Sequence, residues 1–114
     1  PINIVNFEKI MGPNTSDLLS SLLVIFLEET PPLLAQIQTA VQDNNPEHLR
    51  QLAHSLWGSS ASVAAIPFSA LSYELEEIGK GVDISPALPI LAQMETEFAR
   101  IEAWVSSRMV GEPA

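Results

Sequence analysis

His54 is the residue of this chain whose type and surroundings most readily suggest chemistry. It lies in the segment QLAHSLWGSSASVAA, residues 51–65, where small side chains dominate the positions after it. A free imidazole titrates near neutral pH, at about 6.5, so a histidine can serve as a nucleophile or an acid–base group in cells. Small neighbours such as Gly58 and Ala61 would leave the ring edge open. Most exposed histidines are simply solvated, and His48 is interpreted in that way.

Other combinations of reactive side chains are weaker candidates for a site. The chain has no cysteine, which excludes thiolate chemistry and disulfides. Glu74 and Glu77 are one helical turn apart, but di-iron bundles use Glu-x-x-His motifs and the sequence contains none. The serines after His54 have no placed acid that would complete a hydrolase triad. There is no Gly-rich phosphate loop and no kinase signature. We therefore predict no metal site and no cofactor on this chain.

Composition restricts the classes of partner. The chain has 114 residues, 46% of them hydrophobic, which suits a single domain over residues 1–114 with one core. The formal net charge is −9 and the five Lys and Arg residues are scattered, so we expect no binding to nucleic acid or to anionic membranes. The longest apolar run, Leu18 to Leu27, is shorter than the about 20 residues of a membrane span. We expect a cytoplasmic, monomeric domain.

Apolar residues recur at helical spacing throughout the chain, and the alternation typical of strands is nearly absent. Pro31 and Pro32 interrupt one long apolar register that continues beyond them, which predicts a kinked but continuous helix. Asn45 followed by Pro46 is typical of a helix start. Gly79 and Gly81 are expected to end another helix. The sequence predicts five helices. The first lies within residues 2–11, and the second runs from a cap at Asn14, Thr15 or Ser16 to about residue 43. The others span 46 to about 64, 66 to 79–81, and 85–86 to beyond 105.

These helices predict an all-α fold, an antiparallel four-helix bundle with a short N-terminal helix, because short connections place neighbouring helices side by side. Each helix has one apolar stripe. The expected core residues are Leu19, Leu22, Leu23, Phe26, Leu33, Ile37, Val41, Leu49, Leu52, Ala53, Leu56, Ser60, Val63, Phe68, Leu71, Leu75, Ile78, Leu88, Leu91, Met94, Phe98, Ile101 and Val105.

A helical wheel places His54 on the solvent side of its helix. At about 100° per residue from Leu49, the core stripe lies within about 60° and His54 lies near 140°. A glycine inside a helix costs about 1 kcal/mol against alanine, which favours close approach by a partner at Gly58. The surface neighbours of His54 are Arg50, Gln51, Trp57, Gly58 and Ala61. The acidic residues are interpreted as a solvated face elsewhere, comprising Glu28, Glu29, Glu74, Glu76, Glu77, Glu95, Glu97 and Glu102.

The segment LAHSLWGSSASVAA resembles the motif of histidine-containing phosphotransfer (HPt) domains, which reads roughly A-H-x-L-K-G-S-S-x-x-x-G-A. The resemblance extends over nearly the whole chain. FLEETPPLLAQIQTAVQDNNPEHLRQLAHSL resembles the long proline-containing helix and the histidine helix of that family, and LSYELEEIGK resembles the helix after them. The matching motif residues are Ala53, His54, Leu56, Gly58, Ser59, Ser60 and Ala65.

The resemblance implies a phosphorelay carrier. His54 would accept a phosphoryl group from an aspartate of a response-regulator receiver domain and pass it to another receiver. A divalent metal, Mg²⁺, and a lysine are expected on the receiver, and no cofactor on this domain. Ser55, Gln51 or a backbone group could orient the ring. Arg50, Gln51, Trp57, Gly58 and Ala61 would contact the partner. A hybrid sensor histidine kinase is a further expected partner, and this chain, which begins with Pro1, is either free or a piece of such a kinase.

Two positions depart from the family pattern. The family has lysine where this chain has Trp57, and glycine where it has Ala64. The lysine lies near the phosphoryl group in the family, and Arg50, one turn before His54, is our hypothesis for a substitute. Trp57 indicates a hydrophobic docking contact. The alternative function is an interaction module that docks a receiver or kinase without carrying phosphate, and a metal-binding bundle ranks third.

Overall fold

The computed structural model describes residues 16–110 and confirms the all-α prediction. Four helices follow one another along the chain, and no strand occurs in this range. The helix predicted within residues 2–11 and the cap candidates Asn14 and Thr15 lie outside the described residues. The helices are α2 (Ser16–Gln42), α3 (Pro46–Ser62), α4 (Ile66–Gly79) and α5 (Ala87–Val110).

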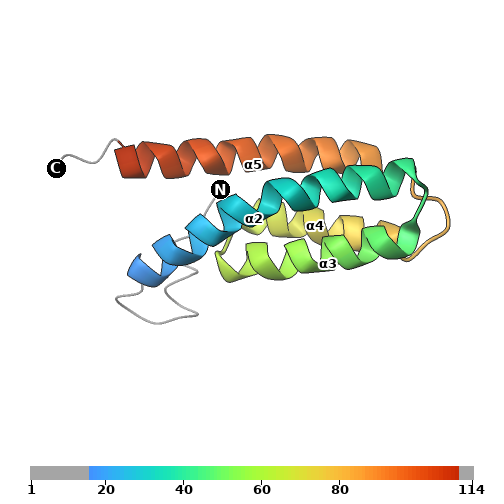
Figure 1. Cartoon of the computed structure of the whole chain (residues 1–114), viewed down its shortest axis with the longest axis horizontal. Coiled ribbons are helices and arrows are strands. Elements are labelled where there is room, and N and C mark those ends of the chain that lie inside the picture. The colour runs from blue at the N-terminus through green and yellow to red at the C-terminus, as the bar shows by residue number, and fades with distance from the viewer. Residues whose placement is uncertain (1–15, 111–114) are drawn as a thin grey trace.

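The helices form an antiparallel bundle in which each one packs against two others (Figure 1). α3 packs against α2 and α4, and α5 packs against α4 and α2, so the four helices enclose one core. Phe26 of α2, Phe68 of α4 and Phe98 of α5 meet there, with ring centroids 5.5–6.3 Å apart. Edge-to-face and tilted rings at these separations are favourable beyond the area they bury. This aromatic cluster ties together three of the four helices.

α2 is one continuous helix through Pro31 and Pro32, as predicted. Both prolines are exposed, and Figure 1 shows α2 changing direction along its length. Proline removes a backbone donor and crowds the preceding turn, which accounts for the bend. Beyond the prolines Leu34 is buried and Leu33 only partly so, a shift of one residue from the predicted stripe.

α2 also bears on the prediction that no segment is long enough to span a membrane. By length and composition alone, residues Leu18–Gln42 qualify, with a mean hydropathy of 1.5. The apolar run Leu18 to Leu27 is shorter than this segment because it ends at Glu28, the first acidic residue of α2 after Asp17. α2 nevertheless packs as a bundle helix, since Phe26 and Ile37 are buried against the other helices.

The start of α5 differs from the prediction. The helix begins at Ala87 rather than at Ser85 or Pro86, and Leu88, expected in the core, is 54% exposed. Ile84 and Ala87 are buried instead, and the Ala87 N–H donates to the Ile84 carbonyl at 3.0 Å. This turn brings Ile84 into the end of the bundle, so the core position assigned to Leu88 is already filled.

α3 begins and ends close to the predicted residues. The Asn45 side chain accepts a hydrogen bond from the His48 N–H at 3.2 Å, and Pro46 occupies the first turn. Beyond the last turn Ala64 is buried with φ 56°, in the left-handed region that favours glycine. This conformation explains why a glycine is suited to this position in the HPt motif.

Replacing Asn45 should weaken α3 at its first turn. Asn45→Ala leaves the His48 N–H without its side-chain acceptor, and we expect a loss of about 1 kcal/mol in the free energy of unfolding, measured by urea denaturation. Asn45→Asp is the matched control because it keeps the acceptor and should retain stability. Equal stability of the alanine variant and the parent chain would show that the cap contributes nothing.

Candidate functional site

His54 lies on the solvent side of α3, as the wheel predicts. Its side chain is 62% exposed, while Ala53 and Leu56 beside it are fully buried. These buried neighbours anchor α3 against the core. A reactive ring on a rigid, well-packed helix is held in one place relative to an approaching molecule.

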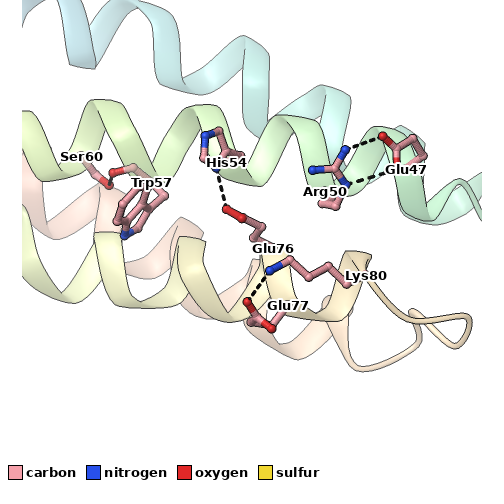
Figure 2. A network of polar contacts seen from close by, with 8 residues as sticks. All are labelled: Glu47, Arg50, His54, Trp57, Ser60, Glu76, Glu77 and Lys80. Carbon is pink, nitrogen blue, oxygen red and sulfur yellow. Dashed lines mark hydrogen bonds and ion pairs between the residues drawn. The ribbon is translucent and has the colours of Figure 1, made fainter.

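The imidazole of His54 is oriented by a carboxylate from the neighbouring helix. Its Nδ1 lies 2.9 Å from Oε1 of Glu76 on α4 (Figure 2). When the Glu76 carboxylate is ionised it has only acceptors, so this contact selects the ring form in which Nδ1 carries the proton and donates it. The lone pair of the neutral ring is then on Nε2, which lies on the side away from Glu76. The pair therefore presents a nucleophilic nitrogen to solvent.

Glu76 is the functional residue that the sequence interpretation missed. It was assigned to a solvated acidic face, but the residue is only 9% exposed, and Glu97 is also buried, at 8%. Glu97 lies 3.6 Å from Arg100, whereas Glu76 pairs with His54. The sequence contains a pattern that could have predicted the burial of Glu76. The buried face of α4 includes Ser69, Ser72, Glu76 and Gly79, at spacings of three and four. A stripe of small residues predicts a closely packed neighbour, and a glutamate within it must face that neighbour.

The other residues suggested to orient the ring have different partners. Gln51 donates from Nε2 to Oε1 of Glu47 at 3.2 Å. No hydrogen bond joins Ser55 to the ring among the described residues. The orienting group is thus a side chain of α4 and none of the local candidates.

Arg50 points away from His54. Its guanidinium donates to both carboxylate oxygens of Glu47, toward the start of α3 (Figure 2). The hydrogen bond and the charge of this carboxylate raise the pKa of Arg50, and the same contact lowers the pKa of Glu47. Lys80, at the end of α4, is likewise held by Glu77 at 2.8 Å, which raises the pKa of Lys80. The hypothesis that Arg50 takes the place of the family lysine therefore requires it to leave Glu47.

Trp57 flanks the ring of His54. The two ring centroids are 5.9 Å apart with an interplanar angle of 36°, and Trp57 is 41% exposed. The indole therefore offers an apolar surface directly beside the imidazole. Large aromatic side chains that remain exposed next to a site are typical anchors for a protein partner.

Gly58 and Ala61 have small side chains, so the surface of α3 next to Trp57 carries no protruding groups. Both are exposed, and a Cβ placed on Gly58 would meet no atom within 4 Å. The bundle itself therefore does not need a glycine at this position. Within the described residues, no group of His, Asp and Glu side chains is arranged to hold a metal ion.

Comparison with known proteins identifies the family. The family model described as "Hpt domain" matches residues 21–104, most of the chain and all of the His54 segment. The chain belongs to the Hpt domain family. Its fold matches the crystal structure of histidine-containing phosphotransfer protein B from Pseudomonas aeruginosa PAO1, with a TM-score of 0.84, 22% identity, and coverage of 98% of this chain and 96% of that one. The comparison with curated sequences gave no match.

Membership defines the general role of the domain. Hpt domains are phosphocarriers of two-component signalling, without kinase activity of their own, and they interact with receiver domains of response regulators. They are typically soluble cytoplasmic modules. His54 lies within the matched residues 21–104, so the surface around it is the candidate functional site of this domain.

Removing the carboxylate of Glu76 should slow the chemistry of His54. Glu76→Gln replaces an acceptor-only group by an amide that can also donate to Nδ1, so Nε2 no longer reliably carries the lone pair. We expect the rate of phosphorylation by phosphoramidate to fall on the order of 10- to 100-fold, the range typical for loss of the groups that orient metal-bound histidines.

Glu77→Gln is the matched control for this experiment. Glu77 is the next residue of α4, but it is exposed and pairs with Lys80 rather than with the ring. Its replacement should leave the phosphorylation rate unchanged. Equal rates for Glu76→Gln and the parent domain would show that the ring does not depend on Glu76.

Proposed function

We propose that this domain accepts a phosphoryl group on Nε2 of His54 from the aspartyl phosphate of one receiver domain and passes it to the aspartate of another, or back. The observation that carries the proposal is the Nδ1–Glu76 contact of 2.9 Å on a ring whose side chain is 62% exposed. One nitrogen is satisfied within the domain, and the other is free toward solvent.

The proposed transfer needs few groups on this chain. The Nε2 lone pair attacks phosphorus while the bond from phosphorus to the aspartate oxygen breaks, and the carboxylate leaves with the electron pair. The Nδ1 proton stays on the ring, which gains positive charge as the new bond forms. Glu76 stabilises that charge through the existing hydrogen bond. Positioning and charge stabilisation account for most of phosphoryl-transfer catalysis, and the receiver would supply its own Mg²⁺ and lysine.

The proposed partner surface surrounds His54 on α3 and comprises Arg50, Gln51, Trp57, Gly58 and Ala61. Trp57 would provide the apolar anchor, and Gly58 the space into which the partner fits. Glu47 and His54 lie about one turn to either side of Arg50 on the helix. Arg50 could therefore leave the carboxylate of Glu47 and bind a phosphoryl group on His54. We further propose that the domain acts as a monomer in the cytoplasm, alone or within a hybrid sensor kinase.

Labelling with phosphoramidate tests the carrier function without a partner protein. We expect one phosphoryl group per chain, read by intact mass under non-acidic conditions, and its loss on brief exposure to acid. His54→Gln should abolish the label, whereas His48→Gln, which alters an exposed histidine of the same helix, should retain it. A folded parent domain that takes up no label would overturn the proposal.

A second candidate is an interaction module that docks a receiver or kinase without carrying phosphate. Trp57 in place of lysine favours it, as does the pairing of both Arg50 and Lys80 with glutamates of their own helices. The two functions share the docking surface and differ in the reactivity of His54. Under this alternative, His54→Gln would leave partner binding and signalling output intact.

Truncating Trp57 should weaken docking without removing the label. For a receiver selected from a panel of purified receiver domains, Trp57→Ala should raise Kd about tenfold or more, as at other tryptophan hot spots, when measured by calorimetry. Phosphoramidate labelling should persist because Glu76 still orients the ring. Leu88→Ala, which shortens an exposed apolar side chain on α5, is the control. Unchanged affinity for Trp57→Ala would exclude it as the anchor.

A further inference from the structure

α3 and α4 approach each other closely one turn away from His54. Gly79 is buried, and a Cβ added there would lie 2.8 Å from the backbone nitrogen of Arg50 and 2.9 Å from its Cα and Cβ. Real Cβ contacts essentially never occur below 3.0 Å. Two of these atoms are backbone, so a side chain at Gly79 could be accommodated only if the helices moved apart.

Space, and not backbone conformation, is what requires a glycine here. Gly79 does not adopt a left-handed φ, and the residue that caps α4 is Lys80, with φ −80°. The sequence interpretation gave Gly79 the role of ending the helix. α4 does end at Gly79, and the structure also places this residue in the contact between α3 and α4.

This contact adjoins the one that orients the ring. Gly79 follows Glu76 by three residues on α4, and Arg50 precedes His54 by four on α3. Because the two helices are antiparallel, the Arg50–Gly79 and His54–Glu76 contacts occupy successive turns of the same helix pair. Ser72, on the other side of Glu76, is fully buried and donates to the Phe68 carbonyl of its own helix. Small residues thus flank Glu76 on both sides.

The hydrogen bond between His54 and Glu76 tolerates little separation of α3 and α4. Bringing a Cβ at Gly79 from 2.8 Å to an ordinary contact requires a separation of about 0.6 Å or more. Lengthening the 2.9 Å contact between Nδ1 and Oε1 by that amount takes it to the limit of hydrogen-bond geometry. Glu76 is only 9% exposed, so the packed side chains around it restrict the rotamers by which its carboxylate could follow the ring.

We infer that Gly79 is a positioning residue for His54: it permits the helix separation at which Glu76 reaches Nδ1, and so determines which ring nitrogen is free. Gly79 acts through Glu76 and does not touch the reacting atoms. The consequence for phosphoryl transfer rests on the proposed function of His54, whereas the effect on the ring does not.

Long-range ¹⁵N–¹H spectra of the histidine rings test the inference directly, since they report which nitrogen carries the proton. The parent domain should show the Nδ1–H form of His54, and Gly79→Ala should shift it toward a mixture. Phosphoramidate labelling should slow about tenfold, comparable to the loss of an orienting carboxylate. Gly81→Ala is the control, because a Cβ there meets only the Ile78 carbonyl oxygen, at 3.5 Å. It should behave like the parent.

A double-mutant cycle separates positioning from general destabilisation. If Gly79 acts through Glu76, Gly79→Ala should slow labelling about tenfold in the parent background and at most about twofold in a Glu76→Gln background. Equal slowing in both backgrounds, or an unchanged His54 spectrum in Gly79→Ala, would overturn the inference.

Two further outcomes are decisive. If Gly79→Ala is unfolded in buffer, the spectra are recorded with trimethylamine N-oxide, which favours the folded state. Failure to fold even then would contradict the inference, since Gly79 would serve the fold and not the ring. If the parent domain takes up no label, the proposed function fails, but the ring spectra still decide the role of Gly79.

Discussion

The hydrogen bond between His54 and Glu76 is the constraint on which the site depends. A carboxylate with so little exposure needs a hydrogen-bond partner inside the domain. The imidazole supplies that partner, and the carboxylate in return fixes the ring. Each group therefore satisfies a requirement of the other, and the result is a reactive nitrogen whose direction is determined by the bundle.

The rest of the α3–α4 contact follows from this bond. The buried carboxylate of Glu76 meets the ring in the contact between the two helices, and small residues on α4 allow the helices to lie close together there. The aromatic cluster of Phe26, Phe68 and Phe98 lies within the bundle and links α4 to α2 and α5. Core packing and site geometry are thus parts of one arrangement, with large side chains inside the bundle and small ones where α3 meets α4.

Much of this could be predicted from the sequence, because helix periodicity is local information. The order of the helices, the continuous helix through Pro31 and Pro32, and the exposure of His54 all depend on residues within one helix. Leu88 was assigned wrongly because the buried stripe in the first turn of α5 runs through Ala87 and Leu91, and Ile84 fills the end of the core before the helix begins. The contact of Glu76 with His54 and that of Gly79 with α3 were missed for a different reason. A wheel shows which way a side chain faces, but only the register between two helices shows what it meets.

The division of the site between two helices has a consequence for signalling fidelity. His54 and Glu76 are 22 residues apart in sequence and meet only when α3 and α4 are docked. A chain that is partly folded, newly synthesised or damaged still contains the histidine, yet it lacks the carboxylate that prepares it. Under the proposed function, such a molecule would take up phosphoryl groups more slowly than the folded domain and would divert fewer of them from the relay. The orientation of the His54 ring thus depends on the folding of the whole domain.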